Sequence, residues 1–227
     1  MKLLVLALAP AIAIMVYIYI KDKYEREPIK LLLINFGLGA TASILMTLII
    51  GAFGNFFLPV TDPESILQQF IKAFIVVALV EEFSKYVIVR YVAQNNKEFD
   101  EPFDGIVYAV MVAMGFAALE NIMYVFQYGM TNGIIRAFSA VPAHATFGIL
   151  MGFFMGKAKF ARTKKERIKL NVTGLLAATL FHGAYDFFLF INFIPGISIG
   201  AFISLIIGLV LSSKAIKKHQ ENSHFKH

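Results

Sequence analysis

Two adjacent carboxylates and a lysine, Glu81, Glu82 and Lys85, interrupt a long apolar stretch of this sequence. Apolar residues flank them at 74–80 and 86–89, and the whole run has the length of a membrane span. A charge at the centre of a bilayer costs at least ~2.5 kcal/mol on insertion scales, so ionisable residues within a span indicate function. A structural ion pair between Glu81 and Lys85, which are four residues apart on one helix face, would leave Glu82 unexplained.

Further polar side chains occur in the three apolar stretches that follow. His182 and Asp186 are four residues apart, so Asp186 can accept a proton from one ring nitrogen and fix the tautomer of the imidazole. Asn121 and Asp186 also have a structural interpretation, because such side chains join helices through hydrogen bonds. Several carboxylates and two imidazoles in hydrocarbon nevertheless demand a cation, a shared proton or a water-filled cavity. The candidate catalytic residues are Glu81, Glu82, Lys85, Glu120, Asn121, His144, His182 and Asp186.

This set of side chains is compatible with two kinds of chemistry. A glutamate can act as a general base on water, while His and Asn side chains polarise a carbonyl and hold the oxyanion. Alternatively, Glu and His side chains bind a divalent metal that activates water, and this ligand set suits zinc. Because Glu82 lies off the face shared by Glu81 and Lys85, we expect Glu82 to be the base. The expected metal ligands are Glu82, Glu120, His144 and His182, and a metal-free glutamate mechanism remains open.

The composition is that of a polytopic membrane protein. Of the 227 residues, 58% are hydrophobic and only 16% are charged, and the mean hydropathy is +0.70. Soluble domains average about 45–50% apolar and about 25% charged residues. The sequence has no Cys, which excludes disulfides, a thiolate nucleophile and thiolate metal ligands. We expect the lipid bilayer to be a partner and expect no nucleic-acid binding.

Apolar stretches predict an all-α bundle of seven membrane spans, forming a single transmembrane domain over residues 1–227. We interpret the first stretch as a retained anchor rather than a cleaved signal peptide. Lys and Arg gather after the first, third and fifth spans and in the C-terminal tail, whereas the other loops have none until Arg136, at the start of the fifth span. The positive-inside rule then predicts an outside N-terminus and a cytoplasmic C-terminus. The predicted spans are 3–20, 31–50, 70–93, 106–126, 133–154, 170–193 and 197–211.

At these residues the chain resembles the PrsW-type intramembrane proteases, which are relatives of the CAAX prenyl endopeptidases. Four motifs carry the resemblance, in order and each on its own predicted span: E-E-x-x-K at 81–85, F-x-x-x-E-N at 116–121, H-x-x-x-G at 144–148 and H-x-x-x-D at 182–186.

The polar stretches 24–28 and 101–105 also resemble that family. The CAAX branch has E-E-x-x-x-R and a His where this chain has Glu120, so the resemblance does not imply cleavage of prenylated proteins. It implies an intramembrane endopeptidase of the bacterial cytoplasmic membrane. The implied reaction is site-1 cleavage of an anti-sigma factor, a single-pass membrane protein, in an envelope-stress response.

Two other functional classes, a transporter or channel and a retinal photoreceptor, also place ionisable residues within membrane spans. A proton-coupled transporter or channel would use the same buried carboxylates and imidazoles. Such proteins favour inverted repeats with broken helices in two halves, whereas the polar residues here occupy four consecutive spans. A retinal photoreceptor would need a lysine in the last span, and 197–211 has none.

The expected depth of the site follows from the predicted spans. Counting at about 1.5 Å per residue from their ends places Glu81, Glu120, His144 and His182 in the outer half of the bilayer. We therefore expect the site to open to the extracytoplasmic side.

Overall fold

The computed structural model describes residues 2–226, and within them every regular element is helical, which confirms the predicted all-α fold. Widened π-helical turns at Gly39–Ser43, Lys72–Leu79 and Val89–Ala93 continue the neighbouring helices. The helices are α1 (Lys2–Lys21), α2 (Ile29–Leu38), α3 (Ile44–Phe57), α4 (Ile66–Ile71), α5 (Val80–Ile88), α6 (Pro102–Phe138), α7 (Ala140–Lys159), α8 (Lys164–Phe190) and α9 (Ile199–Glu221).

Five helical stretches of the described chain are long and apolar enough to cross a membrane. One of them, Pro102–Lys159, contains both α6 and α7. The run from α4 to Ala93 is also continuously helical, and it carries the charged residues Glu81, Glu82 and Lys85. The chain is thus a helical membrane protein, while the seven-span count and the orientation stay predictions. The five stretches are Leu3–Lys21, Ile29–Phe57, Pro102–Lys159, Lys164–Phe190 and Ile199–Glu221.

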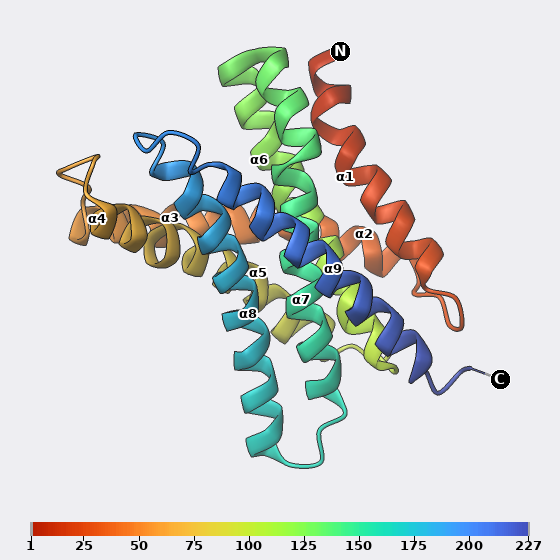
Figure 1. Cartoon of the computed structure of the whole chain (residues 1–227). Helices are drawn as coiled ribbons and strands as arrows, with labels where there is room; N and C mark the ends of the chain where they lie inside the picture. The colour runs from red at the N-terminus through yellow and green to blue at the C-terminus, as the bar shows by residue number, and fades with distance from the viewer. Residues whose placement is uncertain (1, 227) are drawn as a thin grey trace.

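A break at one glycine inside α6 reverses the chain and leads it toward α7, and this reversal is the α6–α7 turn. A straight helix of 37 residues would be about 55 Å long, far more than the ~30 Å core of a bilayer. Gly129, with φ 81° and ψ −172°, adopts a conformation open to glycine and interrupts α6. The chain stays helical after Gly129 and turns back toward α7, where we expected a loop. Figure 1 shows this turn at the top of the bundle, near the N-terminus.

The first half of α6 is the centre of the bundle. Nearly every residue from Phe103 to Ala118 is buried, with α1, α2 and α7 packed around it. Close contact with α7 depends on glycine, because a Cβ at Gly105 would lie 2.5 Å from the carbonyl oxygen of Gly152. The two backbones therefore meet directly, and α6 and α7 form a rigid support for the side chains beyond them.

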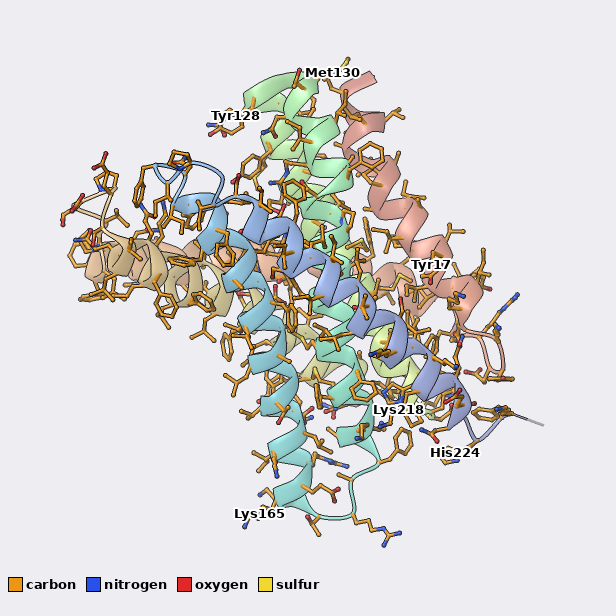
Figure 2. All side chains as sticks on the ribbon, viewed as in Figure 1. Tyr17, Tyr128, Met130, Lys165, Lys218 and His224 are labelled. Carbon is orange, nitrogen blue, oxygen red and sulfur yellow. The ribbon has the colours of Figure 1, made fainter. Side chains whose placement is uncertain are left out.

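Helices α5 and α8 complete the part of the bundle that carries the polar residues. The turn Lys72–Leu79 leads directly into α5 and packs against α8. Gly183 of α8 allows the ring of Phe74 to approach its backbone closely. Figure 2 shows Tyr128 and Met130 at the α6–α7 turn and Lys165, at the start of α8, at the opposite end.

Candidate active site

The structure brings all eight predicted site residues into one connected polar cluster. Helix α5 carries the two adjacent glutamates and the lysine, α6 carries the Glu-Asn pair, and α7 and α8 carry one imidazole each. The members lie far apart in the sequence, and they meet because α5 and α6–α8 converge near the α6–α7 turn. The residues are Glu81, Glu82, Lys85, Glu120, Asn121, His144, His182 and Asp186.

Lys85 is the central cation of the cluster. Its Nζ donates to Glu82 Oε1 over 2.7 Å and lies 3.6 Å from Glu81 Oε2. The same nitrogen lies 3.2 Å from His144 Nδ1 and 4.1 Å from the centroid of the Phe116 ring. The structure therefore differs from the pairing expected from the spacing, because Lys85 is closer to Glu82 than to Glu81.

His182 lies between three carboxylates. Its Nδ1 is 2.8 Å from Glu82 Oε1, which is hydrogen-bond distance, and with Glu82 ionised Nδ1 would be the donor. Its Nε2 lies 3.3 Å from Asp186 Oδ2 and 3.9 Å from Glu81 Oε2. The ring of Phe147 stacks on the imidazole with centroids 4.8 Å apart. Glu82 and Phe147 thus fix the orientation of His182 and direct Nε2 toward Glu81 and Asp186.

Arg136 is a site residue that the sequence did not identify. Its Nη2 donates to Glu120 Oε2 over 2.7 Å, and its Nε donates to Asn121 Oδ1 over 3.0 Å. Glu120 Oε2 also lies 2.9 Å from His144 Nε2. Its signal in the sequence is that it is a lone arginine in a region otherwise free of Lys and Arg, but the sequence places it only at the start of a predicted span.

Asn121 has a different position from the one expected for an oxyanion donor. Its side-chain nitrogen donates to the carbonyl of Ala7 over 2.9 Å, and its oxygen accepts from Arg136. Asn121 is completely buried and does not line the cavity described below. In this structure it joins α1 to α6 and orients Arg136.

A cavity of about 540 Å³ opens beside the cluster. Glu81, His144 and His182 face it, whereas Glu82 is fully buried behind them. Residues of the turn Lys72–Leu79, of the α6–α7 region, of α7 and of the end of α8 form the rest of its wall. They include Tyr124, Asn132, Arg136, Ser139, Leu189 and Phe190.

The charges in the cluster do not balance. Glu81, Glu82, Glu120 and Asp186 are four carboxylates, and Lys85 and Arg136 are the two permanent cations that contact them. With both imidazoles neutral, an excess of two negative charges remains in a low-dielectric setting. Such an excess requires protonation or a divalent cation.

The residues present fit a divalent metal. Glu81, His144 and His182 each offer a ligand atom, and these atoms lie within 4.8 Å of one another. Glu81 Oε2 is buried and has no hydrogen-bond partner. Both ring nitrogens of His144 have neighbours, so ligation by His144 would displace either Lys85 or Glu120. Glu82 and Glu120, which we expected among the ligands, lie outside this group, and the metal assignment stays a prediction.

Comparison with known proteins agrees with these observations. Residues 27–212 match the model of the family described as PrsW family intramembrane metalloprotease. The chain is 48% identical to protease PrsW of Geobacillus kaustophilus, over 52% of each chain. It is 40% identical to protease PrsW of Oceanobacillus iheyensis over 72% of each chain. It is 36% identical to the Bacillus subtilis protein of that name, over 74% of this chain and 73% of the relative.

The chain thus spans about half the length of the first of these relatives and nearly three quarters of the other two. No solved structure matches the chain. The family model covers most of the chain and all four motifs, and its description agrees with the helical membrane fold and the Glu/His cluster. The chain therefore belongs to the PrsW family of intramembrane metalloproteases.

Proposed function

We propose that this chain hydrolyses a peptide bond of a single-pass membrane protein inside the bilayer. The observation that carries the proposal is the cavity of about 540 Å³ in which Glu81, His144 and His182 meet. A cavity of this size admits an extended peptide segment together with water. Peptide hydrolysis inside a membrane needs such a recess, because lipid supplies no water.

Glu81 is the residue that we propose to contact the reacting water. It faces the cavity, and its Oε2 has no hydrogen-bond partner. Glu82 is fully buried, and its Oε1 lies within hydrogen-bond distance of both Lys85 and His182. This arrangement favours a positioning role for Glu82 rather than the role of base that we expected for it.

The remaining cluster residues would position the reacting groups. Lys85 holds the two glutamates, and Glu120, which is held by Arg136, orients His144. If a divalent metal is bound, Glu81, His144 and His182 would hold it, and it would supply a Lewis acid for hydrolysis.

We further propose that the chain crosses the bacterial cytoplasmic membrane seven times, with its N-terminus outside and its C-terminus in the cytoplasm. The cavity is lined by residues on both sides of the α6–α7 turn, which that topology assigns to the outer side. Substrates would therefore enter from the extracytoplasmic half of the bilayer. The family resemblance makes an anti-sigma factor, cut at site 1 during envelope stress, the proposed substrate.

The test is a cleavage assay in liposomes with a single-pass peptide substrate. We expect cleavage by the unaltered chain, loss of cleavage in Glu81→Gln, and loss in the presence of a chelator with recovery on adding zinc. Full activity of both Glu81→Gln and Glu82→Gln, each folded normally, would exclude a glutamate mechanism. Coupled proton uptake without any cleavage would instead indicate a transporter.

A further inference from the structure

A second cluster of carboxylates lies at the other end of the bundle. The α1–α2 connection contributes Asp22, Glu25 and Glu27, and the first turn of α6 contributes Asp104. Asp22, Glu27 and Asp104 are buried, which is rare for carboxylates that lack a cationic partner. Figure 1 shows the α1–α2 connection, the start of α6 and the C-terminus near one another at the lower right.

In three of these four residues, one carboxylate oxygen accepts a hydrogen bond from the protein. Asp104 Oδ2 accepts from the backbone N–H of Glu101 over 2.7 Å and caps α6. Asp22 Oδ2 accepts from the backbone N–H of Glu27 over 3.2 Å. Glu27 Oε2 accepts from the hydroxyl of Tyr108.

The other oxygen has no partner in any of the four residues. Asp22 Oδ1, Glu25 Oε2, Glu27 Oε1 and Asp104 Oδ1 are all buried without a hydrogen bond. Glu27 is 1% exposed and Asp104 is 0% exposed, so bulk solvent does not reach these oxygens. Oxygens of Glu25, Glu27 and Asp104 lie within 4.8 Å of one another.

No Lys or Arg forms an ion pair with this cluster in the part of the chain that the structure describes. Within residues 3–226, the Lys and Arg ion pairs all involve other carboxylates. Charged carboxylates buried in this way are costly unless a positive charge is added.

We propose that Glu25, Glu27 and Asp104, with Asp22 beside them, bind a hard divalent cation, Ca²⁺ or Mg²⁺. Oxygen-only ligands select such ions, in contrast to the mixed Glu and His ligands of the active site. The bound ion would join the α1–α2 connection to the start of α6. The C-terminal segment would be tied in as well, because Ser223 donates to Glu101. This inference does not depend on the proposed peptidase activity.

The test uses Tb³⁺, a luminescent substitute for Ca²⁺, with the detergent-purified full chain. The sequence has no Trp, so energy transfer would come from tyrosine, and Tyr108 contacts Glu27 directly. We expect tyrosine-sensitised emission from bound Tb³⁺, and this emission should fall when Ca²⁺ or Mg²⁺ displaces the Tb³⁺. The ion that displaces Tb³⁺ at the lower concentration is the one that the site prefers.

Two variants and a matched control complete the design. Glu25→Gln, at a partly exposed position, should weaken Tb³⁺ binding by about tenfold, as loss of one charged ligand does, and Asp104→Asn should weaken it at least as much. Glu98→Gln removes an acidic side chain outside the cluster, which is paired with the exposed Lys97. This variant should bind Tb³⁺ as tightly as the unaltered chain does. Absence of sensitised emission, or equal affinities in Glu25→Gln and Glu98→Gln, would overturn the proposal.

Discussion

Replacing Lys85 with Met should destabilise the protein strongly. The side chain of Lys85 is 2% exposed, and its Nζ lies 2.7 Å from an oxygen of Glu82, whose side chain is 0% exposed. Met is similar in length, but it loses the cation–π contact with Phe116 and leaves two buried glutamates without their cation. Removing one partner of a buried ion pair typically costs about 3–5 kcal/mol, because an uncompensated charge remains inside.

The chain offers a matched control. Lys217 and Glu221 form an i,i+4 pair at 3.8 Å, close to the 3.6 Å of Lys85 and Glu81, but both side chains are more than half exposed. Lys217→Met should therefore cost at most ~0.5 kcal/mol. Unfolding by SDS in mixed micelles, followed by circular dichroism, measures both free energies of unfolding.

A double variant separates the charge effect from packing. Glu82→Gln in the Lys85→Met background removes one of the two unpaired charges, the more deeply buried one, so at least half of the lost stability should return. If Lys85→Met were as mild as Lys217→Met, or if Glu82→Gln lowered its stability further, the buried ion pair would not be the stabilising feature that we describe.

Three further predictions concern positioning and packing. Arg136→Gln should lower the rate of substrate cleavage by about 10–100-fold with normal folding, because it removes the charge and the two contacts with Glu120 and Asn121. Arg136→Lys should retain more activity than Arg136→Gln, because lysine keeps the charge although it cannot make both contacts. Equal rates for the two variants would contradict this. Asp186→Asn should reduce cleavage by a similar factor, since Asp186 lies 3.3 Å from His182 Nε2; unchanged kinetics would remove it from the site. Gly152→Leu should lower the free energy of unfolding by about 1–3 kcal/mol, because its Cβ would collide with the α6 backbone; unchanged stability in the SDS titration would refute this contact.

The residues of the candidate site could be found from the sequence because charges within apolar stretches are conspicuous. The spacing also predicted that Asp186 would lie within reach of His182, and Asp186 Oδ2 lies 3.3 Å from His182 Nε2. The spacing could not decide which glutamate lies nearest to Lys85, since positions three and four residues away share the same helix face. That choice depends on rotamers and on the contact of His182 with Glu82.

Arg136 could not be assigned from local sequence. Glu120 and Arg136 are 16 residues apart, which on a straight helix would separate them by roughly 24 Å. The break at Gly129 turns the chain back and brings Arg136 Nη2 within 2.7 Å of Glu120. Gly129 by itself does not indicate such a reversal, because many other glycines of this sequence lie within continuous helices. The acidic cluster at the other end was likewise missed, because its members come from two separate segments, the α1–α2 connection and the first turn of α6.

The position of the cut in a single-pass substrate tests the active site and its orientation together. Reconstituted enzyme would be incubated with the substrate in liposomes, and the new chain ends would be located by mass spectrometry. We predict one main cut near the extracytoplasmic end of the substrate's transmembrane helix, present with the unaltered chain and absent with Glu81→Gln. A cut in the cytoplasmic juxtamembrane region, or the same cut with Glu81→Gln, would contradict the proposed cavity as the place of hydrolysis.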